Sequence, residues 1–176
     1  MDIFAEQLVK KVPDGKTVAL KILIGMLAGL IAAASVFFTL IGLPIALLLG
    51  AGAVYAGYYF ISGLDCEYEY IVTNGDVDVD KIIAKRTRKR LITAKASLFE
   101  RFGRLDDAPE VSDSATIVKV DGYCDEDTEL YYADFTHQTI GETRLIFSPT
   151  DKLLEGIVPF LPRNTRVEFD RAYKNK

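Results

Sequence analysis

The sequence lacks tryptophan and contains one histidine and two cysteines among 176 residues. One histidine is too few for a multi-histidine metal site, and no nucleophile motif surrounds either cysteine. Two cysteines this far apart also exclude a small module held together by disulfides. A glycine-rich phosphate loop is missing as well. These absences argue against an enzyme. We expect no catalytic residue, no metal and no cofactor, and we expect His137 to be a surface residue near a strand end.

Charge is missing from one long segment. Every Lys, Arg, Asp and Glu lies outside Ile22 to Leu64, although charged residues make up 26% of the chain. Such a segment excludes an ordinary soluble globule and a disordered chain. As a single helix it would run ~65 Å, about twice the ~30 Å hydrocarbon core of a membrane. The segment 22–64 therefore predicts a transmembrane hairpin of two helices.

The two helices are expected to meet at Ile41-Gly42-Leu43-Pro44, because glycine is a poor helix former and the residue before proline avoids the helical region. This gives spans of Ile22–Leu40 and Ile45–Gly63. One alternative is a helical hairpin buried in a soluble protein, although neither span has a polar face. Another is a signal peptide cleaved near Ala32-Ala33-Ala34-Ser35, although the apolar run continues past that site.

Basic residues flank the charge-free segment on both sides, and the loop between the spans carries none. Positive flanks tend to stay inside, so we expect the bacterial cytoplasmic membrane with both termini cytoplasmic. Tyr55, Tyr58 and Tyr59 near the end of the second span are typical of an aromatic belt. Neither span contains an ionisable residue, which argues against a transporter core.

Small residues recur four apart in both spans, a spacing that lets helix backbones approach closely. The residues predicted to pack in this way are Gly25, Gly29, Ala33, Gly50 and Gly57. The simplest use is packing of one span against the other. The same faces also allow a homo-oligomer.

Residues 1–21 form a flank before the first span. Phe4, Leu8 and Val12 recur at helical spacing, which predicts an amphipathic helix up to Val12. That helix would lie on the inner leaflet or pack against the C-terminal domain. Pro13-Asp14-Gly15 is expected to end it.

Residues 65–176 predict a β-rich cytoplasmic domain. Asn74-Gly75 between the alternating runs Cys66–Thr73 and Asp76–Ile82 is a strong hairpin signal. Alternation places Tyr68, Tyr70, Val72, Val77 and Val79 on the core face, and Glu67, Glu69, Asp76, Asp78 and Asp80 on the other. Further strands are expected at Leu91–Ser97, Thr116–Val120, Glu129–Thr136, Thr143–Phe147 and Arg166–Asp170.

Helix signals in this domain are few. Ser148-Pro149-Thr150-Asp151 predicts one short helix with Ser148 as N-cap, and Pro159 ends it. Leu98–Phe102 predicts a single helical turn. The fold class is therefore α+β: a transmembrane helical hairpin followed by an antiparallel barrel or sandwich of six or seven strands with one short helix.

Charge is segregated within the domain. From Lys81 to Arg104 nine basic residues accompany one acid, whereas from Asp106 to Glu142 eleven acids accompany one lysine. The net charge of the chain is −4, which does not favour nucleic acid as a partner. Any anion must therefore bind locally. The candidate is the basic run, defined as Lys85, Arg86, Arg88, Lys89 and Arg90.

Two interpretations of the basic run compete. In the first, it is a surface that contacts anionic lipid headgroups on the inner leaflet. Alternatively, Arg86, Arg88 and Arg90 alternate on a third strand and pair with Asp76, Asp78 and Asp80. The acidic segment Asp125–Glu129 is a second candidate contact surface. It lacks the spacing of a calcium loop, which favours an acidic turn.

Three stretches carry a family resemblance: MDIFAEQLVKK at the start, TNGDVDVDKIIAKRTRKRLI (Thr73–Ile92) and FSPTDKLLEGI (Phe147–Ile157). Together they resemble a family of small bacterial two-span membrane proteins of unknown function with a cytoplasmic β-rich domain. More loosely, a two-span hairpin before a strand-turn-strand unit is similar to bacterial pleckstrin-homology-like membrane proteins. The predicted order departs from that fold, which ends on its helix, because here a strand comes last.

The sequence thus predicts a non-enzymatic binding or scaffold domain held at the cytoplasmic face of a bacterial membrane. Its expected partners are the bilayer, anionic lipid headgroups or a protein. The alternative is a structural subunit of a membrane assembly formed through the Gly/Ala-rich helix faces.

Overall fold

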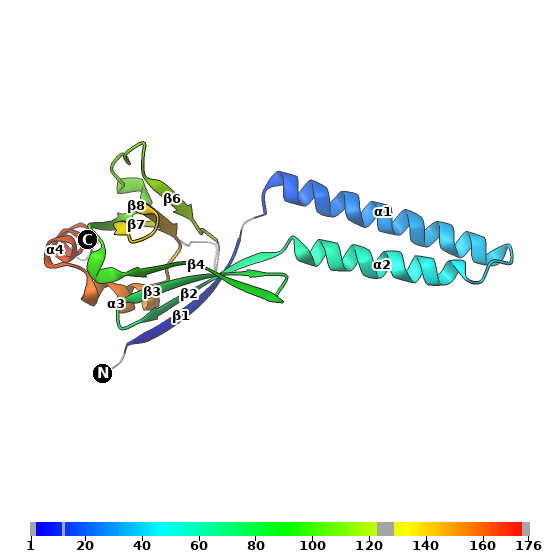
Figure 1. The fold of residues 1–176 in the computed structure, drawn as a ribbon, viewed down its shortest axis with the longest axis horizontal. Coiled ribbons are helices and arrows are strands. Elements are labelled where there is room, and N and C mark those ends of the chain that lie inside the picture. Colours follow the sequence, from blue (N-terminus) through cyan, green and yellow to red (C-terminus); the bar gives the residue numbers. More distant parts are fainter. Residues whose placement is uncertain (1–2, 12, 123–128, 174–176) are drawn as a thin grey trace. The chain divides into compact units, whose positions relative to one another are not determined.

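The computed structural model describes residues 3–11, 13–122 and 129–173 (Figure 1). It contains two compact units. The hairpin unit comprises Pro13–Cys66 and Ile83–Thr87, and the sheet domain comprises Met1–Val12, Glu67–Ile82 and Arg88–Lys176. The strands are β1 (Phe4–Lys10), β2 (Cys66–Thr73), β3 (Asp76–Ile83), β4 (Thr87–Lys95), β5 (Arg101–Arg104), β6 (Thr116–Lys119), β7 (Tyr131–His137) and β8 (Gly141–Phe147). The α-helices are α1 (Gly15–Leu40), α2 (Ala46–Gly63), α3 (Asp151–Ile157) and α4 (Arg163–Tyr173).

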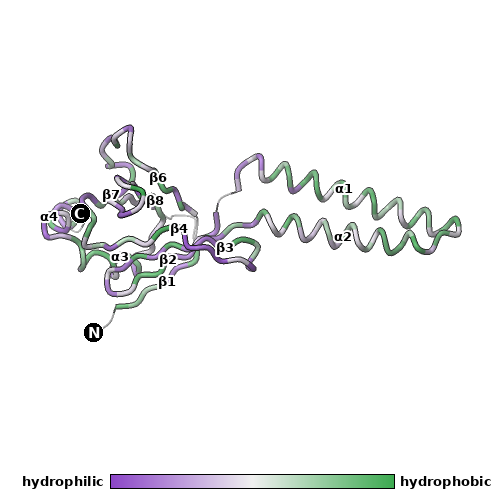
Figure 2. The backbone as a smooth tube through the Cα atoms, viewed as in Figure 1, coloured by the Kyte–Doolittle hydropathy of each residue, from purple (hydrophilic) through white to green (hydrophobic). Residues whose placement is uncertain are grey.

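The hairpin unit confirms the predicted break between two apolar helices. Asp14 caps α1, because its side chain accepts a hydrogen bond from the Thr17 backbone N–H (3.0 Å). The helix therefore begins before Ile22 and includes Lys16 and Lys21. The turn after α1 places Gly42 at φ 98°, a conformation that glycine adopts without strain. By length and composition, both helices are suited to crossing a membrane, and Figure 2 shows their apolar character.

The two helices pack through small residues. A Cβ added at Gly50 would lie 1.9 Å from Ser35 Oγ, and one added at Gly57 would lie 2.8 Å from Ala28 Cβ. The predicted packing role therefore fits Gly50 and Gly57. Gly29 has no atom within 4 Å of such a Cβ, and Ala33 is exposed. On α1, the contact with α2 thus includes Ala28 and Ser35, which were not among the residues predicted to pack.

The first sheet has the order β1-β2-β3-β4. The predicted β2–β3 hairpin is confirmed, with positive φ at Asn74 (51°) and Gly75 (84°), as a tight primed turn requires. β1 pairs antiparallel with β2 from Phe4↔Thr73 to Lys10↔Glu67. Along the chain, the helical hairpin therefore lies between β1 and β2, two strands that pair with each other.

The predicted N-terminal helix is wrong, because residues 4–10 form the edge strand β1. Phe4 and Leu8, whose spacing suggested a helix, are 60% and 45% exposed. The buried side chains are Ala5, Gln7 and Val9, which alternate with period two. Gln7 tolerates burial because its amide donates to the Ser148 carbonyl (2.8 Å) and accepts from the Thr150 N–H (2.7 Å).

The second sheet has the order β5-β7-β8-β6. The described residues contain eight strands rather than six or seven, because β1 and β5 were not predicted as strands. The sheet is also mixed, because β6 pairs parallel with β8. The helical turn expected at Leu98–Phe102 lies earlier, as a 3-10 turn at Ala96–Leu98, and β4 begins four residues before the predicted Leu91.

The predicted strand at Arg166–Asp170 is wrong, because this segment belongs to helix α4. The strand was expected because Val167 and Phe169 lie two residues apart, but Val167 is 49% exposed. The inward positions are instead Thr165 and Phe169, which lie four residues apart on one helix face. The chain thus has a second C-terminal helix, and the predicted departure from the pleckstrin-homology-like order disappears.

The predicted N-cap of α3 is also wrong. The N-cap is Thr150, whereas Ser148 is fully buried and accepts a hydrogen bond from the Gly122 N–H (3.2 Å) through its hydroxyl. α3 ends at Ile157, before a 3-10 turn at Val158–Phe160 that contains Pro159.

The core of the sheet domain confirms the predicted inward face of the β2–β3 hairpin. Tyr70, Val72, Val77 and Val79 are completely buried. The Tyr70 hydroxyl donates to the Val120 carbonyl (2.5 Å), and its ring meets the Phe147 ring edge-on at 5.7 Å. Burial of this hydroxyl raises the pKa of Tyr70.

Candidate binding surface around the basic run

The basic run is divided between the two units. Lys85 and Arg86 belong to the hairpin unit, in the turn between β3 and β4, whereas Arg88, Lys89 and Arg90 lie on β4 in the sheet domain. All five are exposed residues. Sequence reasoning treated them as one surface, but the two parts have different neighbours.

Arg88 and Arg90 pair with carboxylates of their own sheet. Arg90 Nη1 lies 2.7 Å from Asp78 Oδ1, and Arg90 Nε donates to Asp80. Arg88 pairs with Glu69 and approaches Asp80 (Nη1 to Oδ2, 3.9 Å). These two arginines therefore follow the ion-pairing interpretation, with Glu69 in place of one predicted aspartate.

These ion pairs cover buried acids. Asp80 is 3% exposed and Glu69 5% exposed. Burial raises the pKa of the Glu69 carboxyl, and nearby Glu6 raises it further, whereas Arg88 acts in the opposite direction. Arg88 is thus the charge that favours the ionised form of Glu69, so an external anion would have to compete with this carboxylate.

Arg86 has a different environment. Its Nη2 donates to Ser62 Oγ (2.9 Å) and to the Tyr59 carbonyl (3.3 Å), and its guanidinium lies 4.2 Å from the centre of the Tyr59 ring. All three contacts join the β3–β4 turn to the last turns of α2, within the hairpin unit. For Arg86, the predicted ion pairing with the aspartates of β3 is therefore replaced by contacts with α2.

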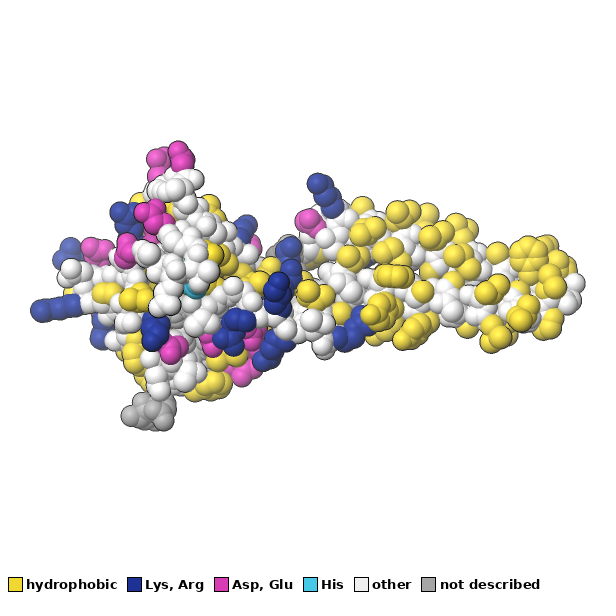
Figure 3. Space-filling model, in the orientation of Figure 1, with side chains coloured by type: hydrophobic (Ala, Val, Ile, Leu, Met, Phe, Trp, Pro, Cys, Tyr) yellow, Lys and Arg dark blue, Asp and Glu magenta, His cyan; other side chains and the backbone are white. Residues whose placement is uncertain are grey.

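Lys85 and Lys89 have no ion-pair partner in the part of the chain that the structure describes. Lys85 occupies the tip of the β3–β4 turn, where Ala84 and Lys85 both have φ 56°. Figure 3 shows basic side chains near the end of the hairpin at which α1 begins and α2 ends, next to hydrophobic side chains that cover both helices.

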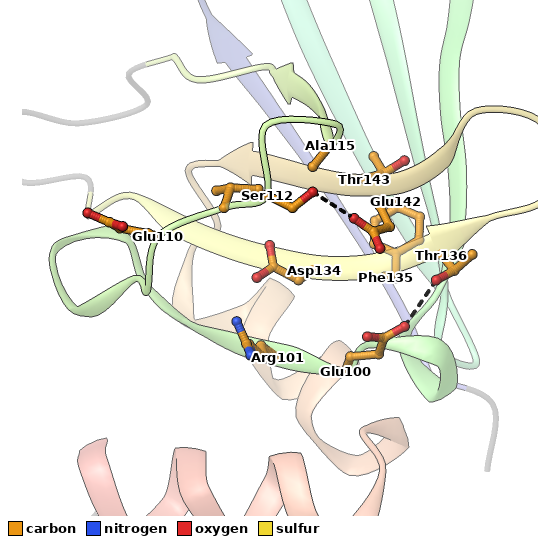
Figure 4. Close-up of a pocket in the computed structure, with 11 residues that line it drawn as sticks. Glu100, Arg101, Glu110, Ser112, Ala115, Asp134, Phe135, Thr136, Glu142 and Thr143 are labelled. Carbon is orange, nitrogen blue, oxygen red and sulfur yellow. Dashed lines mark hydrogen bonds between the residues drawn. The ribbon is translucent and has the colours of Figure 1, made fainter.

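Sequence reasoning did not find a pocket of about 250 Å³ in the sheet domain (Figure 4). Its charged lining residues are Glu100, Arg101, Glu110, Asp134 and Glu142. Ser112 donates to Glu142 (3.1 Å), and Thr136 donates to Glu100 (3.1 Å). These carboxylates come from separate segments of the chain, so no local motif brings them together. With four carboxylates and one arginine in its lining, the cleft has a net negative charge and favours cationic groups over anions.

The remaining predicted positions give no further site. His137 ends β7 and accepts a hydrogen bond from the Thr139 N–H through Nδ1 (3.2 Å), as expected for a strand end. Asp125–Glu129 lies outside the described residues apart from Glu129, which pairs with Arg104 (2.9 Å). Within residues 3–11, 13–122 and 129–173, no group of three or more His, Cys, Asp or Glu is placed to hold a metal ion.

Comparison with protein families identifies the fold. Residues 1–167 match the family model described as Bacterial PH-like domain (DUF6106). Searches of curated proteins and of solved structures gave no match. The observed order of elements agrees with this description, because the chain ends on helix α4 after the last strand. Since the match spans nearly the whole chain, the protein belongs to the bacterial PH-like domain family DUF6106.

Proposed function

We propose that this protein is a non-enzymatic binding domain anchored in the bacterial cytoplasmic membrane by the α1–α2 hairpin. The observation that carries the proposal is the outward apolar surface of the hairpin. Only 6% of the most apolar stretch of α1 and 17% of that of α2 is buried. A core helix of a soluble protein buries most of such a surface. From Ile22 to Leu40 α1 extends ~28 Å, close to the ~30 Å hydrocarbon core.

The position of β1 supports a retained hairpin rather than a cleaved signal peptide. β1 precedes α1 in the chain and pairs with β2 along its whole length. Cleavage near Ala33 would remove this edge strand. Loss of β1 would remove the buried side chains of Ala5 and Val9 from the core and leave β2 as an unpaired edge of the first sheet.

The orientation is tested by labelling single cysteines with a membrane-impermeant maleimide. In a chain with Cys66→Ser and Cys124→Ser, we expect Lys85→Cys to react only when the cytoplasmic face is accessible. Leu43→Cys, in the loop between the helices, is expected to react only from the opposite face. The charges that flank the hairpin set this orientation.

Lys152→Cys in α3 is the matched control, because it reports on the sheet domain. Labelling of all three cysteines in intact cells, or recovery of the protein in the soluble fraction, would contradict the anchored topology. The binding role itself has two candidate ligands, anionic lipid headgroups near Lys85 and Arg86 or a protein with basic side chains at the acidic cleft.

A structural subunit is the second candidate function, and one observation favours it. Gly29 and Ala33 are exposed on α1, beside the seam with α2 rather than within it, whereas a Cβ added at Gly25 would meet Ile61 of α2 at 3.9 Å. Close-packing positions that the hairpin does not use are available to another helix.

If the protein is a structural subunit, two glycine substitutions should have different effects. Gly29→Leu, which meets open space within one chain, should abolish a homo-oligomer while leaving the hairpin intact. Gly50→Leu collides with Ser35 and should open the hairpin itself. Light scattering of the detergent-solubilised protein measures the mass, and crosslinking between α1 and α2 measures hairpin closure. An unchanged mass with Gly29→Leu would remove the subunit candidate.

A further inference from the structure

The base of the helical hairpin carries a set of cations drawn from two distant parts of the sequence. Lys16 lies in the first turn of α1, and Lys85 and Arg86 lie in the β3–β4 turn. We call these three residues the basal cations. They belong to one compact unit with both helices. Because α1 begins where α2 ends, all three lie near the same end of the hairpin.

Two contacts hold the β3–β4 turn at this end. The Ala84 N–H donates to the Asp65 carbonyl, just after α2 (2.9 Å). Arg86 is fixed to α2 by its contacts with Ser62 and Tyr59. Ala84 and Lys85 both have positive φ, which is costly for residues other than glycine. The turn is thus held in a strained conformation that presents Lys85 outward.

The basal cations keep donors available. Lys16 and Lys85 are exposed and have no ion-pair partner in the described ranges. Within the described residues, the hydrogen bonds of Arg86 use Nη2, which leaves Nη1 and Nε for an external acceptor. Lys21 differs, because its Nζ is already 2.5 Å from Asp65 Oδ1. The available charge at this end is therefore positive.

Three tyrosines lie on the second half of α2, and the ring of Tyr59 is in contact with Arg86. Tyr55, Tyr58 and Tyr59 on α2 are 69%, 71% and 50% exposed. Amphipathic aromatic rings favour the boundary between headgroups and hydrocarbon. Arg86 lies over the Tyr59 ring, which places its charge at the level of this aromatic belt.

We propose that the basal cations bind the phosphates of anionic phospholipid headgroups. The inference rests on the proposed membrane anchoring and names the ligand that the hairpin base recognises. The guanidinium of Arg86 supplies directional donors to phosphate oxygens, while the ammonium groups of Lys16 and Lys85 supply mobile positive charge. Arg88 and Arg90, which are paired with their own sheet, take no part.

The test uses the full chain. Because the sequence contains no tryptophan, one introduced tryptophan gives the only indole fluorescence. Tyr58→Trp introduces a single indole at the aromatic belt. The protein is reconstituted in vesicles of phosphatidylcholine and phosphatidylglycerol, with one of the two lipids brominated on its acyl chains. Quenching of indole fluorescence by each brominated lipid gives the ratio of anionic to zwitterionic lipid next to the hairpin.

We expect phosphatidylglycerol to quench preferentially at low salt, and the preference to fall as salt rises. Each basic residue near an anionic surface contributes about fivefold to the attraction. The variant Lys16→Ser/Lys85→Ser should lower the preference towards unity. These two residues make no ion pair in the described chain, so the variant should fold normally. Arg86→Lys keeps the charge but loses the guanidinium donors, and should lower the preference less.

The charge-matched control is Lys95→Ser/Lys152→Ser, two exposed lysines of the sheet domain, which should retain the full preference. Equal quenching by both lipids in the wild-type chain would overturn the inference while leaving the anchoring intact. Absence of quenching by either lipid would overturn the anchoring itself. Phosphate binding by the solubilised protein, without lipid preference in vesicles, would assign the basal cations to a free anion and overturn the lipid assignment.

Discussion

Replacing Arg144 by methionine is expected to destabilise the sheet domain by about 3–5 kcal/mol, the usual cost of removing one partner of a buried ion pair. Arg144 is 5% exposed. Its Nε and Nη2 each lie 2.6 Å from an oxygen of Asp134, and Nη1 donates to the Pro109 carbonyl (2.8 Å). The hydrogen bond with Asp134 raises the pKa of Arg144, so the side chain stays charged. Methionine would leave the Asp134 carboxylate without its counter-charge.

The free energy of unfolding would be measured by chemical denaturation of the full chain, followed by near-ultraviolet circular dichroism of the tyrosines. Lys119→Met is the control, since the pair of Lys119 with Asp121 is exposed and should contribute only ~0–1 kcal/mol. The double variant Arg144→Met/Asp134→Leu should recover most of the loss, because it removes both buried charges. A loss below about 1 kcal/mol for Arg144→Met would contradict this prediction and show that solvent in the cleft already screens the Asp134 carboxylate.

This bidentate pair illustrates what sequence reasoning could not predict. Asp134 and Arg144 lie on β7 and β8. From the sequence alone, each looks like an ordinary polar residue of an alternating strand. The Pro109 carbonyl comes from a distant loop. Whether a charged residue is buried depends on such distant partners, and no local periodicity records them.

Local patterns were reliable where the deciding physics is local. The Asn74-Gly75 turn and the break at Gly42 follow from backbone preferences of those residues. The pattern failed at β1, where Phe4 and Leu8 lie four apart, a spacing that both helix and strand satisfy. Only the burial of Gln7, satisfied by Ser148 and Thr150, distinguishes them. The pairing of Arg88 with Glu69 was likewise not predicted, since Glu69 lies on β2, far from the basic run in sequence.

The pair of apolar helices was predictable in outline for the same reason. Absence of charge over a long segment is a property of composition alone, and it indicates two apolar helices without knowledge of contacts. The residues that pack the two helices were harder to predict, because Gly29 and Gly50 have the same local context of small residues. They differ because Gly50 faces Ser35 of the other helix, whereas a Cβ added at Gly29 would have no atom within 4 Å.

Replacing Gly75 by alanine is expected to destabilise the sheet domain by about 2–5 kcal/mol, for two separable reasons. Gly75 has φ 84°, and a side chain in the left-handed region costs roughly 1–2 kcal/mol. The added Cβ would also lie 2.5 Å from Phe160 Cγ, and overpacking of this kind costs about 1–3 kcal/mol. The turn has little room to move, because the Gly75 carbonyl accepts a hydrogen bond from the Ala96 N–H (2.8 Å).

Gly141 provides the matched control. Its φ is 75°, yet no atom lies within 4 Å of an added Cβ, so Gly141→Ala should cost only the backbone part, about 1–2 kcal/mol. Phe160→Ala in the Gly75→Ala chain removes the collision, and the coupling between the two changes measures the steric part. Equal losses for Gly75→Ala and Gly141→Ala would mean that Phe160 moves aside freely. A larger loss at Gly75 would show that the C-terminal segment is packed firmly over the β2–β3 turn, although the two are far apart in the sequence.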